Sequence, residues 1–383
     1  MHARTWTRML TMFGLALAGL VWLGACERKE NDGQKEIAIG AVMPLTGDAA
    51  KYGESAKNAI ELALSELNTA GGIDGATVRV IYEDSEAVPQ KGVSAFQKLV
   101  TLDHVPAVIG GIASSVTLAM APIANRSEVV ILSPTSSNPQ ITDAGDYVFR
   151  NCASDVFEGQ VMAEAAHAKL GISTAAILRI NNDYGVGIAN VFRERFTAAG
   201  GKILAEEVFQ QGDTNLRAQV TKLGALDPKP DAIYLVGHKE LGQALKQCAE
   251  LGVKAKFLST VMFEDPEILQ VAGAAAEGVI YSARAYDPES KDPAIQAFVK
   301  SYRARYESTP DIFAALAYDS MRILALAMKT GGTSAAGIKD ALYKIKDFPG
   351  ACGSTSFDDN GDVIQPAFLK TVRDGRFGWL EDE

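Results

Sequence analysis

The segment that decides the fold is IAIGAVM, residues Ile37–Met43, a short apolar run typical of a buried strand. It is followed by a stretch in which Ile60, Leu64 and Leu67 recur at helical spacing, closed by two glycines. The same order of strand and helix recurs through residues 77–133. Strict alternation of this kind indicates parallel strands with crossover helices, so the sequence predicts an open α/β sheet.

A second series of the same kind begins after residue 155. Its predicted strands are AAILRI, KILAEEVF, DAIYLVG and AKFLST, separated by helices near residues 157–169, 185–198, 214–225 and 239–251. The last hundred residues instead contain three nearly consecutive helical stretches, about 293–307, 311–329 and 334–346, then an Asn-Gly turn and the apolar segment AFLKTV. The sequence therefore predicts two doubly wound α/β sheets of similar size.

The first 25 residues predict an export signal and not a part of the fold. Arg4 and Arg8 precede an apolar run, Met9–Leu23, that ends in small residues before Cys26. The run is shorter than the roughly 20 residues that cross a bilayer. Its end, LGAC, resembles a bacterial lipoprotein cleavage box, in which Cys26 becomes the lipid-carrying first residue. Residues 26–35 would then form a charged tether.

Composition excludes several classes of protein. Without the predicted signal, 358 residues carry 35 lysines and arginines against 47 aspartates and glutamates, a net charge of −12. This balance argues against a nucleic-acid partner, which requires clustered basic residues. No later segment is long and apolar enough to cross a membrane. A chain of this length usually forms two cores.

Three cysteines remain after Cys26, at spacings that fit neither a disulfide framework nor a zinc site. Cys248 shares an apolar helical face, which predicts a buried core thiol. Cys152 and Cys352 could pair in an exported protein, and the sequence leaves that pairing open.

Polar loops follow three strands predicted in the first half: MPLTGDAAKYG (43–53), GGIASSVT (110–117) and SPTSSNP (133–139). In open parallel sheets, ligands bind beyond the carboxyl ends of the strands. Ser114 and Ser115 are predicted to cap the following helix, whose free N–H groups favour an anion. We predict a polar cleft suited to a small carboxylate. For any one loop, ordinary capping and turn formation is the alternative.

The second half offers further candidates at its predicted strand ends. The segment RINNDYG supplies Arg179, Asp183 and Tyr184, and VGHKE supplies His238. Tyr52 from the first half and Tyr184 from the second are predicted to close over a ligand from opposite sides.

Catalytic and metal-binding patterns are sparse in the sequence. It contains no nucleophile elbow, phosphate-binding loop, dinucleotide fingerprint or zinc-protease motif. Only His104, His167 and His238 remain beyond the predicted signal, too few for a histidine cluster. The segment DDNGD lacks the spacing of a calcium loop, and a tight turn explains it. We therefore expect no catalysis, no cofactor and no metal.

Several longer motifs resemble one family. They are IGAVMPLTGDAAKYG, NTAGGIDG, VIGGIASSVT, ILSPTSSNPQIT, NDYG and TSFDDNGD. From about Glu36 onward the chain is similar to the Leu/Ile/Val-binding solute-binding proteins of ABC importers, with the type I periplasmic-binding fold. The resemblance implies two lobes joined by a three-crossing hinge that closes on a ligand in the cleft. It places residues 36–152 plus 284–364 in the first lobe and residues 153–283 plus 365–383 in the second.

The resemblance also implies roles for residues at matching positions. Ser114 would hold the ligand carboxylate, Thr135 would contact the ligand through its backbone, and Ser137 would offer a hydroxyl. Tyr52 and Tyr184 match aromatic residues that pack on the ligand. With the candidates from strand ends, the predicted ligand-binding residues are Tyr52, Ser114, Ser115, Thr135, Ser136, Ser137, Asp155, Arg179, Asp183, Tyr184, His238 and Val261.

One departure from the family pattern concerns the ligand. In amino-acid-binding members, a glutamate after the FLS-type strand pairs with the ligand ammonium, whereas FLSTVMFED has Val261 there. His238 also stands where relatives often carry an aromatic residue. An unpaired ammonium in a dry cleft costs several kcal/mol. Two alternatives remain: Asp155 or Asp183 replaces the missing acid, or the ligand is a carboxylate without an amine, such as an aromatic acid.

The sequence thus predicts a monomeric, lipid-anchored extracytoplasmic binding protein that captures a small carboxylate or amino acid for an inner-membrane ABC permease. A ligand-sensing module of the same fold is the first alternative. A serine hydrolase using Ser114 or Ser137 is the second, and no general base is identifiable beside either serine.

Overall fold

The computed structural model describes residues 35–284, 286–363 and 365–380. The predicted export signal, the lipid-bearing Cys26 and nearly all of the tether lie outside these residues and stay predictions. In the described parts of the chain, no helix has the length and apolar character needed to cross a membrane.

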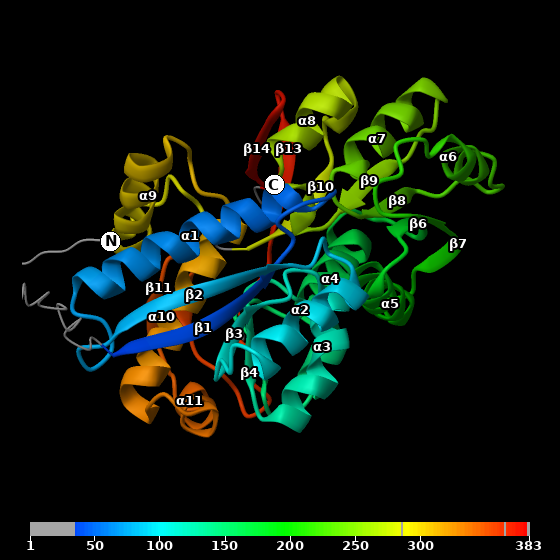
Figure 1. Ribbon diagram of the computed structural model, residues 1–383. Coiled ribbons are helices and arrows are strands. Elements are labelled where there is room, and N and C mark those ends of the chain that lie inside the picture. The colour runs from blue at the N-terminus through cyan, green and yellow to red at the C-terminus, as the bar shows by residue number, and fades with distance from the viewer. Residues whose placement is uncertain (1–34, 285, 364, 381–383) are drawn as a thin grey trace, which may run out of the picture. The chain divides into compact units, whose positions relative to one another are not determined.

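The first lobe is built on a five-stranded parallel sheet in the order β2-β1-β3-β4-β5 (Figure 1). Strand β1 (Glu36–Met43) pairs with β2 (Thr77–Asp84) on one side and with β3 (Ala107–Gly110) on the other. Strands β4 (Val130–Ser133) and β5 (Val148–Arg150) extend the sheet beyond β3. The segment IAIGAVM therefore occupies an interior strand, as predicted.

Helices cover both faces of this sheet, because successive side chains of a strand point to opposite sides. Ile39, Ala41 and Met43 of β1 face one core, and Val42 faces another. The first core also contains residues of α1 (Ala50–Thr69), α9 (Pro293–Tyr306), α10 (Ile312–Gly331) and α11 (Ala335–Leu342), and the second those of α2 (Pro89–Thr101) and α3 (Ser114–Ser127). The late helices thus return to the first lobe, which is doubly wound as predicted.

The second lobe contains a seven-stranded sheet in the order β14-β13-β10-β9-β8-β6-β7. Five strands are parallel, and the C-terminal hairpin joins β10 in antiparallel orientation. The strands are β6 (Thr174–Ile180), β7 (Lys202–Phe209), β8 (Ala232–Val236), β9 (Lys256–Ser259), β10 (Ile280–Ala283), β13 (Phe368–Arg373) and β14 (Arg376–Trp379). The helices are α4 (Asp155–Glu164), α5 (Asp183–Ala198), α6 (Arg217–Gly224), α7 (Glu240–Glu250) and α8 (Pro266–Ala272), and a π-helical turn, Ala165–Lys169, continues α4.

Five short strands were not predicted from the sequence pattern. They are β5, β10, β14, and the two strands of a hairpin, β11 (Phe348–Gly350) and β12 (Gly353–Thr355). Each has three or four residues, too few for a period of two to be recognised. The predicted final strand, AFLKTV, corresponds to β13.

The chain passes between the two sheets three times: after β5, after β10 and before β13. These passages agree with two lobes joined by three crossings. The residue boundaries of the lobes given above stay a prediction.

A buried ion pair connects the first crossing to the third. Arg150 Nε donates to Asp362 Oδ1 at 2.6 Å, and Nη2 donates to Oδ2 at 2.5 Å. Arg150 Nη1 donates to the carbonyl oxygens of Ser137 (3.1 Å) and Asn138 (2.9 Å). Because the Arg150 side chain is wholly buried, one guanidinium fixes both the hinge and the hydroxyl-rich loop.

The three cysteines among the described residues are all buried and free. Cys248 belongs to the core of the second lobe, as predicted. Cys152 and Cys352 both belong to the first-lobe core and are not bonded to each other.

Candidate functional site

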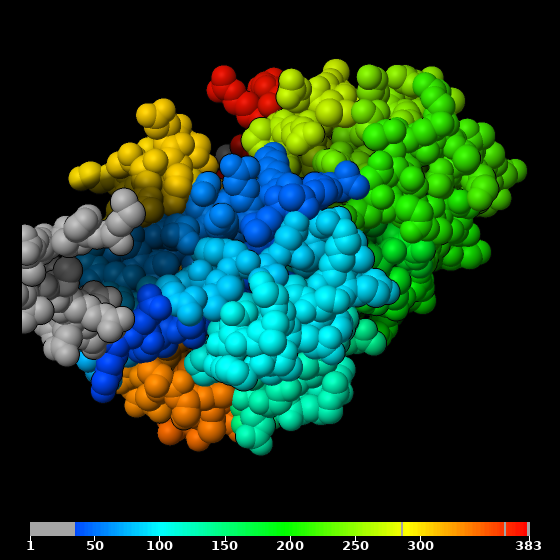
Figure 2. Space-filling view, in the orientation of Figure 1, coloured from blue at the N-terminus to red at the C-terminus, as the bar shows by residue number. Residues whose placement is uncertain are grey.

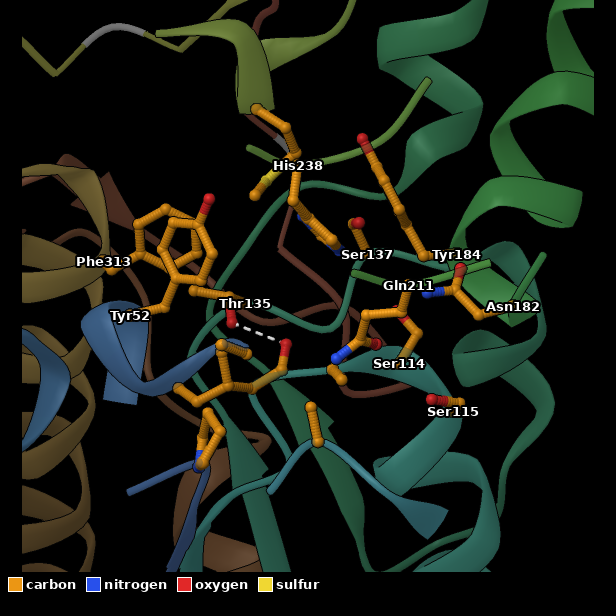
Figure 3. Close-up of a pocket in the computed structure, with 16 residues that line it drawn as sticks. Tyr52, Ser114, Ser115, Thr135, Ser137, Asn182, Tyr184, Gln211, His238 and Phe313 are labelled. Carbon is orange, nitrogen blue, oxygen red and sulfur yellow. Dashed lines mark hydrogen bonds between the residues drawn. The ribbon is translucent and has the colours of Figure 1, made fainter. Parts of the chain in front are cut away.

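A cavity of about 50 Å³ lies between the two lobes (Figure 3). Its walls come from loops and helix starts that follow strands of both parallel sheets, the place where such sheets bind ligands. Seven predicted ligand-binding residues line it: Tyr52, Ser114, Ser115, Thr135, Ser137, Tyr184 and His238. The other lining residues are Pro44, Ala49, Ala87, Ile112, Ala113, Asn182, Gln211, Met262 and Phe313. The structure therefore brings most of the candidates together.

One wall of the cavity is the start of helix α3. The extended residue Ala113 is the N-cap and no side chain caps the helix, so the prediction that Ser114 and Ser115 cap it is wrong. The helix begins at Ser114 because Gly111, with φ +68°, turns the chain immediately after β3. Among the described residues, no acceptor bonds the N–H of Ser114 or of Ser115. These N–H groups and the helix dipole favour a bound anion.

The hydroxyls of the loop after β4 divide into two sets. Ser133 and Ser136 both donate to the carbonyl oxygen of Gly111, which also accepts from Thr117 at 2.8 Å. This set holds the loop against the end of β3, and Ser136 does not line the cavity. Thr135 does line it, and its hydroxyl donates to the Ile112 carbonyl at 2.9 Å, the dashed line in Figure 3. Ser137 also lines the cavity, and its side chain lies beside the buried carboxyl group of Asp155.

Aromatic rings form much of the remaining lining. Tyr52 packs against Phe313 with ring centroids 4.5 Å apart and ring planes tilted by 38°. The ring of His238 lies 5.8 Å from that of Tyr52 and 5.6 Å from that of Tyr184. Tyr184 donates its hydroxyl to Thr260 Oγ1 at 2.8 Å. Burial lowers the pKa of His238, so its ring is neutral near pH 7, and its Nδ1 has no partner among the described residues. Figure 3 shows His238 between the two tyrosines, so the three rings face one small space.

Five predicted residues lie off the cavity, and local structure explains each case. Ser136 points into the loop, as described above. Arg179 lies on β6, where its Nε pairs with Glu206 of β7 at 2.5 Å. Asp183 is exposed at the start of α5, and its neighbour Asn182 lines the cavity instead. Val261 turns toward a separate cavity, and Asp155 is buried behind the wall.

The structure adds lining residues that the sequence did not single out. Asn182 is in the predicted loop RINNDYG, one residue before the one chosen. Gln211 follows β7, so the strand-end rule could have found it. Met262 follows β9, and Phe313 is in the first turn of α10, which returns from the distant C-terminal part of the chain. No local sequence signal marks Phe313.

Two acidic residues of α4 lie behind the cavity. Both carboxylate oxygens of Asp155 are buried without a hydrogen-bond partner among the described residues. Burial, followed by the nearby charge of Glu158, raises the pKa of Asp155 well above its usual range. Glu158 Oε1 instead accepts from Val261 N and from Ser282 Oγ, both at 2.7 Å. The described residues contain no cluster of three or more potential metal ligands.

The two lobes touch across the mouth of the cavity. Figure 2 shows first-lobe atoms around the start of α1, in blue, lying against second-lobe atoms in green. Lys51 pairs with Asp265 at 2.6 Å, and Lys239 pairs with Asp48 at 3.1 Å. Both side chains of the Lys239–Asp48 pair are more than a third exposed, so that pair contributes under about 1 kcal/mol and does little to hold the lobes shut.

Comparisons with known proteins agree with this fold. Residues 36–376 match the family model described as periplasmic binding protein. The leucine-, isoleucine-, valine-, threonine- and alanine-binding protein of Pseudomonas aeruginosa is 28% identical over 85% of this chain and 87% of its own length. The branched-chain amino acid transporter substrate-binding protein LivJ of Streptococcus pneumoniae, solved with isoleucine, is 33% identical with a TM-score of 0.81, covering 90% of this chain and 98% of its own.

A third similar protein carries a different ligand. The solute-binding protein of an ABC transporter from Rhodopseudomonas palustris BisB5, solved with 3,4-dihydroxybenzoic acid, is 26% identical with a TM-score of 0.80. The match covers 89% of this chain and 95% of that one. With a family model spanning nearly all the described residues, this chain belongs to the periplasmic binding protein family, in its Leu/Ile/Val-binding type, the substrate-binding proteins of ABC transporters.

Proposed function

We propose that this protein clamps a small carboxylate between its lobes and delivers it, chemically unchanged, to an inner-membrane ABC permease. The observation that carries the proposal is the uncapped start of α3 at the cavity wall. There, the N–H groups of Ser114 and Ser115 stand with the hydroxyls of Ser114 and Ser137. A carboxylate accepts charge-assisted hydrogen bonds from this set, and the closed lobes exclude water that would compete.

Relatives with different ligands support a carboxylate as the common element. The Streptococcus pneumoniae protein was solved with isoleucine and the Rhodopseudomonas palustris protein with 3,4-dihydroxybenzoic acid. These two molecules share a carboxylate, while only isoleucine carries an ammonium group. The backbone N–H groups at the start of α3 in the present protein suit the carboxylate that both ligands share.

The lining also bears on the rest of the ligand. None of the described lining residues is an aspartate or a glutamate, so an α-ammonium would have no acidic partner at the wall. Asp155 lies behind the wall, and Glu158 is bonded to Val261 and Ser282. Tyr52, Tyr184 and Phe313 offer aromatic faces instead. We therefore propose an aromatic or branched aliphatic acid without an amine, in preference to an amino acid.

A pair of matched compounds tests this function. 4-Methylpentanoate is leucine without its α-amino group, so the two differ only in the part for which the cavity has no partner. We expect 4-methylpentanoate or benzoate to raise the Tm. At a ligand concentration of 100 times its Kd, binding should add about 2.7 kcal/mol to the free energy of unfolding. We expect leucine to bind at least about tenfold more weakly than 4-methylpentanoate. Equal or tighter leucine binding would contradict the amine-free ligand. The absence of a Tm shift with every acid would contradict carboxylate binding itself.

The remaining parts of the proposal concern the whole protein in the cell. Cys26 would carry the lipid anchor, residues 26–35 would be the tether, and the mature protein would act as an extracytoplasmic monomer. The lobes would consist of residues 36–152 plus 284–364 and of residues 153–283 plus 365–383. The position of the crossings after β5 and β10 and before β13 supports this division.

A further inference from the structure

A second cavity of about 220 Å³ also lies between the lobes. By the same measure it is more than four times the size of the first cavity. We call it the back cavity. Val261, Pro266 and Phe377 line it from the second lobe, and Tyr286, Pro310 and Ile312 line it from the first.

The two cavities share a wall made of two short segments. After β9, Val261 lines the back cavity while the next residue, Met262, lines the first cavity. At the start of α10, Ile312 lines the back cavity while the next residue, Phe313, lines the first. Each segment thus contributes one residue to each side. The partition between the cavities is therefore formed by these two segments, one from each lobe.

Met262 is the adjustable part of this partition. It is half-buried and packs against the hydrophobic cores of both lobes. Phe313 packs against the ring of Tyr52 with centroids 4.5 Å apart. A methionine side chain is unbranched and fills irregular space, so a smaller residue at position 262 would enlarge the first cavity while the neighbouring rings stay in place.

The back cavity suits an apolar group. Glu264 and Asp311 line it, but Glu264 is paired with Lys370 at 2.5 Å. Asp311 accepts from Ser55 Oγ at 2.6 Å and from Ala314 N at 2.8 Å, as the cap of α10. Arg284 also lines the cavity, and its Nη1 has no hydrogen-bond partner among the described residues. Away from Arg284, the prolines, Ile312 and the aromatic rings form a mainly apolar lining. The tail of a phenylalkyl carboxylate matches this chemistry.

We propose that Met262 is a specificity-determining residue that sets the length of the ligand by closing the first cavity against the back cavity. This inference rests on the proposed carboxylate-binding function. The carboxylate is held at the start of α3, and the tail runs toward Met262. In the wild-type protein Met262 stops the tail, so short acids are preferred. A smaller residue joins the two cavities and admits longer acids.

The test compares benzoate with 4-phenylbutanoate by calorimetric titration of the full protein. Met262→Ala should raise the affinity ratio of 4-phenylbutanoate to benzoate by about tenfold or more, because the longer tail gains the back cavity. Met262→Leu, which keeps the volume, should retain the wild-type ratio. Ile312→Trp, added to Met262→Ala, refills the back cavity from the other side of the wall and should remove the gain.

The outcomes separate the two proposals. If benzoate binds but Met262→Ala leaves the ratio unchanged, or if the gain survives Ile312→Trp, the role of Met262 is wrong and the carboxylate site stands. A wild-type protein that binds 4-phenylbutanoate as tightly as benzoate also overturns the role of Met262. If neither acid binds any variant, the proposed aromatic ligand is wrong and this inference fails with it.

Discussion

Arg150→Met should lower the free energy of unfolding by about 3–5 kcal/mol in a urea titration. The substitution leaves the carboxylate of Asp362 largely buried without its guanidinium partner, since only 12% of that side chain is exposed. It also removes the donor to the carbonyl oxygens of Ser137 and Asn138. The same change should weaken carboxylate binding, because the loop that carries Ser137 loses its anchor.

Two further variants isolate the cause. In the double variant Arg150→Met with Asp362→Leu, no buried charge is left unpaired, so part of the lost stability should return. Lys222→Met removes one partner of the ion pair with Glu207 at 2.8 Å, in which the lysine side chain is 66% exposed. It should cost less than about 1 kcal/mol. An Arg150→Met protein no less stable than the Lys222→Met protein would contradict the role given to the buried pair.

Asp155→Asn should stabilise the ligand-free protein, and the gain should grow as the pH rises. Burial and then the charge of Glu158 raise the pKa of Asp155 in the folded state above 3.8, the value of an ordinary aspartate. The folded state therefore binds the proton more tightly than the unfolded state does. As the pH rises from about 3.8, the free energy of unfolding of the wild-type protein falls by up to ~1.4 kcal/mol per pH unit. The fall ends once the pH passes the pKa of Asp155 in the folded state. Asparagine has no charge to bury and avoids this loss.

The measurement is the Tm difference between variant and wild type at pH 5 and at pH 8. Asp183→Asn is the matched control, because Asp183 is also the first residue of a helix but is exposed. The control should shift the Tm equally at both pH values. If Asp155→Asn raised the Tm by the same amount at pH 5 and at pH 8, the pKa of Asp155 would not be raised in the folded state.

The long elements of the fold follow from the sequence because their patterns are unambiguous. IAIGAVM is apolar on both faces, and a strand of this kind requires helices on both sides, as α1 and α2 provide. Helix α10 is 20 residues long and mostly apolar, so both of its ends could be predicted to within a few residues. The short strands β5 and β10 could not, because tertiary pairing with long neighbours, and not local pattern, makes them strands.

The residues of the candidate site could be predicted where they lie in a loop that follows a strand of the sheet. Ser114 and Ser137 each come four positions after the last residue of a strand, β3 and β4 respectively. Phe313 could not be found this way, because it reaches the cavity through a helix that returns from some 200 residues later in the chain. No sequence pattern marks Arg150 as the residue that anchors the loop carrying Ser137. The partners of a buried charge are set by the tertiary fold alone.

The most direct test of the central claim is a calorimetric titration with a carboxylic acid and its primary amide, using the wild-type protein and Ser114→Ala. Benzoate and benzamide have nearly the same shape, but only benzoate offers a charge to the start of α3. We predict that benzoate binds the wild-type protein and benzamide binds about 10–100-fold more weakly, and that Ser114→Ala weakens benzoate binding by about 1–3 kcal/mol. Equal binding of acid and amide, with no effect of Ser114→Ala on either, would contradict a cleft that holds its ligand by the carboxylate.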